Sequence, residues 1–182
     1  DPKALTKIEE GLQGVENDAM KLLESENHGV ILHAAIKQLV ACGNVLLHMP
    51  DEGGSRIFRM PMYVVIRDAM GNWHEIVGKE TLSKHTLEEA VKLEAGVSAV
   101  ESTKEDDENI DVFTHITRRN GKAEWHQEIN DVKITGSDGR SALEDCPYIP
   151  LRWAALEGEN YGRGHVEEYL GDLRSLEDLS KS

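Results

Sequence analysis

The chain has 182 residues, 39% of them hydrophobic and 30% charged, and its 34 acidic residues against 20 basic ones give a net charge of −14. A chain of this length buries about 70% of its unfolded surface, which predicts one domain, or one with a small appendage, that folds without disulfides or metals. The acidity argues against a protein that grips nucleic acid, because affinity for a phosphate backbone comes mainly from Lys and Arg.

The first predicted element is a helix over residues 2–26, with Pro2 in a suitable first-turn position. Its apolar residues recur at spacings of three and four and therefore share one stripe. They are Leu5, Ile8, Leu12, Val15, Ala19 and Leu22. The pattern resembles heptads, but it is short, and Gly11 and Gly14 each cost about 1 kcal/mol of helix stability. We therefore expect this helix to pack on its own domain rather than to form a coiled coil.

A second helix is predicted to start near Asn27, a good N-cap, and to belong to the core. Its apolar residues cover a wide face. They are Ile31, Leu32, Ala35, Ile36, Leu39 and Val40. Gly43 and Asn44 then supply a C-terminal stop, and residues 45–49, closed by Pro50, indicate a strand.

From Asp51 the pattern becomes β, with strands near residues 55–59, 63–68 and 73–77. A turn at Gly71-Asn72 joins the last two strands. This succession predicts an antiparallel meander.

A short helix follows the meander and ends near Gly96. Thr86 and Glu89 have the spacing of a capping box at its start. Residues 101–109 contain no apolar side chain and are predicted to form a mobile acidic loop between two β regions.

The clearest β-hairpin joins residues 110–119 to 122–130 through a two-residue turn at Asn120-Gly121. Its register predicts one apolar face. The facing pairs on that side are Val112 with Ile129 and Ile116 with Trp125.

A last β segment over residues 132–135 turns at 136–139 before a strand over 148–154 that looks buried. Residues 161–165 then lead into a helix over 166–179. The elements together predict an α+β fold, in which two N-terminal helices pack on an antiparallel meander and hairpins. Because the chain begins with Asp1 and the last apolar stripe is still running at its end, we expect it to be a piece of a longer protein.

The two cysteines, Cys42 and Cys146, lie far apart in the sequence and suggest neither a disulfide framework nor a metal site. Both are expected to be reduced core residues. The sequence contains no apolar run long enough to span a membrane, no signal peptide and no Asn-x-Ser/Thr acceptor. These features predict a soluble protein made inside a cell.

Gly158, Gly162 and Gly164 precede the last helix, where glycine-rich loops can hold phosphates against free backbone N–H groups. Their spacing matches neither phosphate-binding fingerprint. Glu167 and Glu168, in the first helical turn, would also repel an anion. We therefore interpret this loop as a flexible entry to a long helix.

The hairpin register places His115 opposite His126, so two imidazoles could share a cation. Glu124 and Glu128 are diagonal neighbours and could complete a zinc site, although with eight histidines in the chain such a pair can also arise by chance on an exposed polar face. No Gly-x-Ser-x-Gly elbow is present. A small acidic metal-dependent hydrolase that uses the His115/His126 pair is the alternative function that these residues leave open.

Several long segments follow one another in the order known from one family. They are Ile36–Pro50, Tyr63–Asn72, Ile110–Ile116, Gly136–Gly139, Cys146–Pro150 and Gly158–Gly164 running into Glu167–Leu176. In these segments the chain resembles the portal, or head-to-tail connector, proteins of short-tailed double-stranded DNA phages. The likeness extends over nearly the whole chain.

The resemblance implies that this chain is the wing region of a much longer protein with stem, clip and crown regions. It divides the chain into a helical part with the first strand, a β meander with a short helix, the acidic mobile loop, the β hairpins and the start of the stem-ward helix. These parts cover residues 1–50, 51–100, 101–109, 110–160 and 161–182.

The same resemblance implies a structural subunit and no enzyme, catalytic residue, cofactor or metal. Such portals form a dodecameric ring at one capsid vertex of the virion, contact capsid and scaffold proteins, and pass DNA inward during packaging and outward during ejection. The tail adaptor and the terminase meet regions that this chain lacks. The protein would be made in the host cytoplasm, and an acidic body is compatible with a ring in which DNA slides.

Contact between subunits is the role that we expect the chain to carry, because a ring uses a heterologous interface. The candidate interface residues are charged and lie at the entry to the last helix and in the strand before it. They are Arg152, Arg163, Glu167, Glu168, Asp172 and Arg174. Pairing within the helix, such as Glu167 with Arg163 or Arg174, is the other interpretation. A neck adaptor that binds a portal is a third possible function, but it should not carry the portal's own wing-to-stem sequence.

Overall fold

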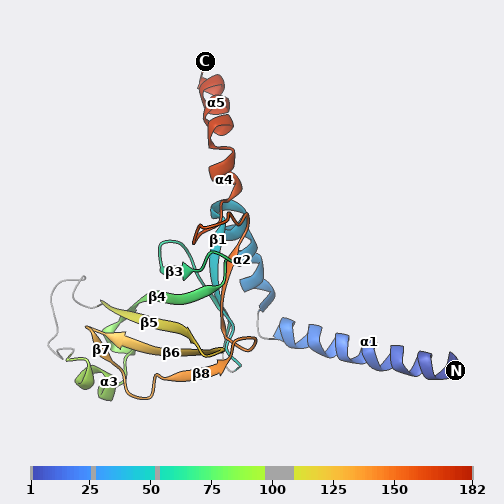
Figure 1. Cartoon of the computed structure of the whole chain (residues 1–182), viewed down its shortest axis with the longest axis horizontal. Coiled ribbons are helices and arrows are strands. Elements are labelled where there is room, and N and C mark those ends of the chain that lie inside the picture. Colours follow the sequence, from blue (N-terminus) through green and yellow to red (C-terminus); the bar gives the residue numbers. More distant parts are fainter. Residues whose placement is uncertain (1, 26–27, 52–53, 97–108, 182) are drawn as a thin grey trace.

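The computed structural model describes residues 2–25, 28–51, 54–96 and 109–181. Its helices are α1 (Pro2–Ser25), α2 (His28–Cys42), α3 (Glu89–Glu94), α4 (His165–Glu168) and α5 (Leu170–Lys181). Its strands are β1 (Asn44–His48), β2 (Arg56–Phe58), β3 (Tyr63–Arg67), β4 (Trp73–Ser83), β5 (Asn109–Arg119), β6 (Lys122–Ile129), β7 (Val132–Lys133), β8 (Gly139–Ala142) and β9 (Tyr148–Arg152). The predicted α+β class is confirmed. The strands form a body from which α1 and α5 extend in different directions (Figure 1).

A three-stranded antiparallel sheet has the order β2-β1-β9. The central strand β1 carries the consecutive buried residues Val45, Leu46 and Leu47, as expected for a strand that is covered on both faces. Strand β9 is at an edge, and its Ile149 and Leu151 are exposed. The prediction of a buried strand therefore holds for only part of β9.

The second sheet has the order β3-β4-β5-β6-β7, and β8 also pairs with β6. The predicted meander is therefore confirmed for β3 and β4 but wrong for β2, which pairs with β1 instead. The predicted hairpin of β5 and β6 is confirmed, with Ile116 opposite Trp125. At its turn Asn120 (φ 50°) and Gly121 (φ 73°) both adopt the positive φ that a two-residue type I′ turn requires.

Strand β8 begins at the last residue of the predicted turn and continues over residues for which the sequence predicted no strand. Its residues, Gly-Arg-Ser-Ala, have no apolar alternation, so pattern gave no signal for it. Gly139 lies opposite Trp125, and an added Cβ would approach the indole ring to 2.1 Å. A glycine at this position lets β8 pair with β6 over the large Trp side chain.

The core consists of two clusters of buried side chains. The larger cluster joins the two sheets, and its members are Leu46, Phe58, Tyr63, Val65, Ile76, Ile116, Ala123, Cys146 and Tyr148. The smaller cluster lies beside α3 and contains Ala95, Ile110, Val112, Ile129 and Ile134. Val112 and Ile129 thus belong to one apolar cluster, as the hairpin register predicted.

Helix α3 exists as predicted, but the predicted capping box does not. Thr86 lies in a 3₁₀ turn (Lys84–Thr86), and its hydroxyl donates to the Ser83 carbonyl at 2.7 Å. The N-cap of α3 is Glu88, and its side chain makes no capping hydrogen bond. The extra 3₁₀ turn moves the start of the helix past Thr86, so the threonine bonds backward along the chain. The acidic loop predicted at 101–109 falls outside the described residues except for Asn109, which begins β5.

Helix α1 forms over the predicted range, but the part of its apolar stripe whose side chains the structure describes is exposed. Ile8, Leu12 and Val15 are 59%, 64% and 68% exposed, and the helix extends away from the sheets (Figure 1). We call these three residues the α1 stripe. The prediction of intradomain packing is therefore wrong for these three residues, because the apolar spacing that makes the helix amphipathic does not provide a surface to cover it.

Helix α2 packs on the body along one face only. His28 and Ala35 are buried, and His28 Nδ1 shares a hydrogen bond of 2.6 Å with the Ser55 hydroxyl. Ile36, by contrast, is exposed. Cys42, at the end of α2, is also exposed, so the predicted core position is wrong for Cys42 and confirmed for Cys146. The wide apolar face of α2 therefore exceeds the area that β1 and α4 cover.

The predicted C-terminal helix is divided into α4 and α5 at Tyr169, whose φ of −105° and ψ of 15° leave the helical region. Leu173, Leu176 and Leu179 of α5 are 50%, 67% and 75% exposed. We call them the α5 stripe. Within the described part of the chain, no helix is both long enough and apolar enough to cross a membrane.

Candidate functional site

Residues 41–44 and 162–164 meet in a junction where α2 ends, β1 begins and the chain turns into α4. Gly43 has a φ of +78°, and an added Cβ would lie 2.4 Å from the Arg163 carbonyl carbon. An added Cβ at Gly164 would lie 2.4 Å from the Ala41 carbonyl oxygen. Backbone atoms cannot move aside as a flexible side chain can, so these positions admit only glycine. The predicted flexible entry is therefore wrong: this junction is closely packed.

Asn44 holds the junction through one side-chain amide. Its Oδ1 accepts a hydrogen bond from the Gly162 N–H at 2.7 Å, and its Nδ2 donates to the Gly162 carbonyl at 2.6 Å. The side chain is buried, so each of these groups would cost about 1–3 kcal/mol if it were left unsatisfied. Beside it, Ala154 and Arg163 form an isolated antiparallel bridge. These buried contacts set the direction in which the chain leaves the body.

Arg67 on β3 joins the two sheets next to this junction. Its guanidinium donates to the carbonyls of Asn160 (3.0 Å), Gly71 (2.9 Å) and Pro150 (2.8 Å). Its backbone N–H donates to Asn160 Oδ1 at 2.8 Å. Burial, and then the charge of Arg152, lower the pKa of Arg67 from its ordinary value. Because Pro150 belongs to β9 and Arg67 to β3, one side chain links the three-stranded sheet to the six-stranded one.

Two of the predicted interface residues hold the loop before α4. Arg152 donates to the Glu159 carbonyl at 2.9 Å. Arg163 forms ion pairs with Glu159 at 3.1 Å and with Glu167 at 3.8 Å. Arg152, Arg163 and Glu167 therefore have partners within the chain, which agrees with the pairing of Glu167 with Arg163 that the sequence left open.

The other three predicted interface residues lie farther along the C-terminal helices. Glu168 pairs with His165 Nδ1 at 3.2 Å. Asp172 and Arg174 are exposed on α5, and neither forms an ion pair with any residue that the structure describes. Of the six charged residues, these two remain available for contact with another molecule.

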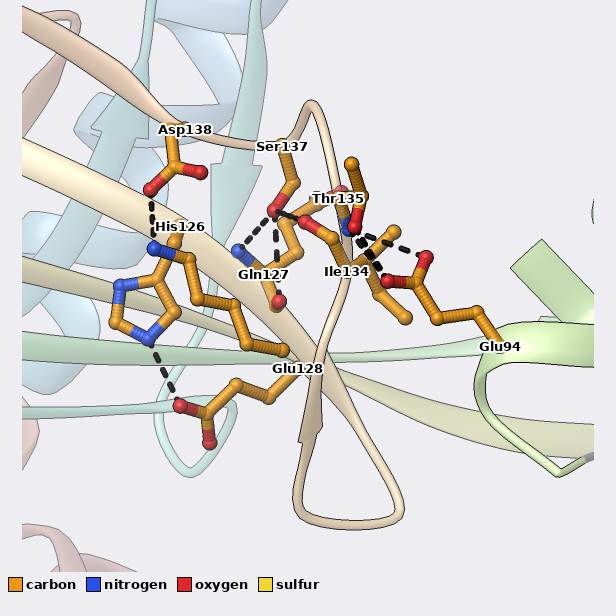
Figure 2. A network of polar contacts seen from close by, with 9 residues as sticks. Glu94, His126, Gln127, Glu128, Ile134, Thr135, Ser137 and Asp138 are labelled. Atoms are coloured by element: carbon orange, nitrogen blue, oxygen red, sulfur yellow. Dashed lines mark hydrogen bonds and ion pairs between the residues drawn. The ribbon is translucent and has the colours of Figure 1, made fainter. Parts of the chain in front are cut away.

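The histidine pair lies on the face of the six-stranded sheet that is opposite the core. His115 and His126 are directly opposite each other, as predicted, with ring centroids 5.3 Å apart. Glu128 accepts a hydrogen bond from His126 Nε2 at 2.8 Å (Figure 2). Glu124 instead pairs with Arg140 at 3.3 Å. Of the two predicted carboxylates, only Glu128 joins the pair.

Comparison with known proteins shows the family to which the chain belongs. The sequence profile of the family described as bacteriophage head to tail connecting protein matches residues 1–182, which is the whole chain. The chain belongs to this family. It is 42% identical over 189 residues to the portal protein of Escherichia phage T7 and 41% identical over 191 residues to that of Enterobacteria phage T3. The portal protein of Pseudomonas phage phiKMV is 34% identical over 185 residues.

These alignments cover 100%, 100% and 97% of the chain but only 35% of each relative. The chain thus spans about a third of the length of the portal proteins that it matches. The family resemblance noted from the sequence is confirmed. Nothing in the comparisons supports the alternative of a metal-dependent hydrolase.

The features of this connector-family chain that sequence reasoning missed are Asn44, Arg67 and the exposure of the two stripes. Asn44 was interpreted only as part of a helix stop, and Arg67 as an ordinary strand residue. Their partners lie 118 and 93 positions away, so no local pattern reveals them. The spacing of the α1 stripe was visible in the sequence, whereas its exposure was not. Large exposed apolar surfaces mark sites of contact with other proteins.

Proposed function

We propose that this chain is the wing region of a phage portal, a structural subunit of the head-to-tail connector ring through which DNA is packaged and ejected. The observation that carries the proposal is the family match over the whole chain, together with relatives that are named portal proteins. The chain acts through assembly and not through catalysis. It belongs at the portal vertex of the virion and is made in the host cytoplasm.

The α1 stripe is the surface that we propose to contact the next copy in the ring. A ring of identical subunits uses a heterologous interface, in which one patch meets a different patch on the neighbour. Helix α1 extends from the body (Figure 1), so its stripe can reach a neighbouring copy. Exposed apolar residues on α2, such as Val30 and Ile36, offer a surface of matching chemistry. Burying these faces against each other stabilises the contact by about 25 cal/mol for each Å² of apolar surface removed from water.

The charged residues at the helix entry have two further roles in this proposal. Asp172 and Arg174 on α5 would form the polar part of the contact, because they have no ion-pair partner among the residues described. Arg152, Arg163, Glu167 and Glu168 would act mainly by holding the loop and α4 in position. Capsid and scaffold proteins are the further partners that the family relationship suggests. The net charge of −14 favours DNA that slides past the ring without binding to it.

The first test is the particle mass of the chain in solution, measured by light scattering and checked by negative-stain images. We expect rings of portal type. Leu12→Glu should abolish them, because it places a charge in the middle of the α1 stripe. Leu93→Glu is the matched control: Leu93 is 85% exposed on α3, outside the stripe, and its substitution should leave the rings intact.

Two results would count against this proposal. A monomeric parent chain would mean that the wing alone does not carry the ring contact. Rings that survive Leu12→Glu would mean that the contact lies elsewhere. Retention of double-stranded DNA by the chain at moderate salt would contradict the sliding interpretation alone.

A further inference from the structure

The polar face of the six-stranded sheet contains a compact set of metal-ligand side chains that lies outside the ring contact proposed above. His115 on β5 and His126 on β6 are held opposite each other by the ladder that pairs Phe113 with Glu128 and continues to the turn. Their rings are 5.3 Å apart and nearly perpendicular, at 78°. Both side chains are partly buried, at 30% and 24% exposure. The backbone therefore places the two imidazoles side by side before any ligand arrives.

Glu128 supplies a third donor on the same face. It lies two residues after His126 on β6, and side chains at i and i+2 of a strand point to the same side. Its carboxylate is already turned toward the His126 ring, and the two residues share the 2.8 Å hydrogen bond visible in Figure 2. One ligand atom from each of His115, His126 and Glu128 lies within 4.8 Å of the others. A tetrahedral Zn²⁺ ion with bonds near 2.1 Å needs donors about 3.4 Å apart, so side-chain rotation must bring the three donors closer together before they can bind one ion.

Glu75, on the neighbouring strand β4, orients His115. The Nε2 of His115 donates a hydrogen bond to its carboxylate. A carboxylate is a usual outer partner of a metal-binding histidine. It fixes the ring and its tautomer and makes the imidazole a better ligand. The second ring nitrogen, Nδ1, is then left to bind a metal. Nearby cations are neutralised separately, since Arg140 pairs with Glu124 at 3.3 Å and Lys133 with Asp138 at 2.5 Å.

We propose that His115, His126 and Glu128 bind one divalent first-row transition metal ion, of which Zn²⁺ is the type. Two imidazoles and one carboxylate suit Zn²⁺ or Fe²⁺ rather than Mg²⁺ or Ca²⁺, which prefer oxygen ligands alone. Three protein ligands leave a position for water. The ion cross-links β5 and β6 on the face opposite the core and stabilises the folded state, because it binds that state more tightly than the unfolded chain.

The test is calorimetric titration of the metal-stripped chain with Zn²⁺, together with the visible absorption of Co²⁺ bound in its place. We expect saturation at a single ion per chain, a Co²⁺ spectrum typical of tetrahedral coordination, and a thermal midpoint that rises with Zn²⁺. Glu128→Gln keeps the size of the side chain and should weaken binding by about 10-fold or more. His126→Ala should abolish the Co²⁺ spectrum and the rise in midpoint.

The controls are His74→Ala and Cys42→Ser, which remove exposed ligand groups outside the cluster. Both should leave the affinity unchanged. Circular dichroism of each variant without metal shows whether the hairpin is still folded, and Glu128→Gln decides the question if His126→Ala does not fold. The proposal is overturned if the chain shows no saturable Zn²⁺ binding. It is also overturned if binding survives Glu128→Gln and His126→Ala, or if it is lost in Cys42→Ser or His74→Ala.

Discussion

The two sheets differ from the two extended helices, α1 and α5, in the exposure of their apolar side chains. Ile76 and Ile116 in the sheets are 0% exposed, whereas Leu12 and Leu176 on the helices are 64% and 67% exposed. Both regions have regular apolar spacing. The difference shows that such spacing predicts which face of an element will be covered, but not whether the same chain covers it.

The junction of residues 41–44 with 162–164 joins the body to α4, which leads into α5. It is built from backbone contacts that exclude a Cβ and from the Asn44 amide. The junction is therefore closely packed up to the point where α4 begins, and it sets how α4 leaves the body. This arrangement suits a subunit whose contacts lie at its ends.

The largest expected effect is a difference in stability between a substitution in the sheets and one on an extended helix. Ile116→Ala removes a fully buried side chain and is expected to lower the free energy of unfolding by about 2–5 kcal/mol. Leu12→Ala should change it by less than about 0.5 kcal/mol, because the side chain is exposed in the single chain. Urea denaturation of both variants under conditions that keep the chain monomeric measures the difference. Equal losses would show that the α1 stripe packs within the chain after all.

A second comparison uses two glycines on either side of the exit from the body. Gly164→Ala would place a Cβ against the Ala41 carbonyl and should destabilise the chain by about 1–3 kcal/mol. Gly171→Ala on α5 meets nothing within 4 Å and should stabilise it by about 0.5 kcal/mol, because alanine favours a helix. Thermal midpoints of the two variants should therefore shift in opposite directions. A neutral Gly164→Ala would mean that the junction is loose.

The smallest of the three effects concerns pH and the body alone. Burial, followed by the charge of Arg56, lowers the pKa of His48 from its ordinary value of 6.5 to about 4. His48 stacks on Tyr148 with centroids 4.4 Å apart, and its Nδ1 accepts a hydrogen bond from Arg56 at 3.1 Å. The unfolded chain binds the proton more tightly, so the stability from the neutral imidazole is fully present above pH 6.5 and is lost as the pH falls toward 4.

Denaturation curves between those two pH values should show a loss of about 1–2 kcal/mol, a figure reduced because solvent reaches part of the ring. His48→Gln should flatten this part of the pH profile. His33→Gln, on the exposed side of α2, is the matched control for the substitution itself. A profile that His48→Gln leaves unchanged would show that this imidazole is not the group responsible.

Particular residues show how far the sequence could predict the candidate site. Asn120-Gly121 determined the hairpin turn, and with it the pairing of His115 with His126, because a two-residue turn allows one register. The choice between Glu124 and Glu128 was not predictable, since it depended on Arg140 from β8, a strand without apolar alternation. The charged residues near α4 were identified as a group, but only their neighbours revealed that Arg152 and Arg163 hold a loop.

The sequence by itself determined the α+β class, most of the helix and strand ranges, the hairpin register and the family resemblance. These depend on local spacing, turn chemistry and the order of segments along the chain. Only the tertiary structure decided that β2 pairs with β1, that Asn44 clamps Gly162, and that the α1 and α5 stripes face solvent. Those features depend on contacts between residues far apart in the sequence, and an amphipathic pattern is the same whether its apolar face meets its own domain or another subunit.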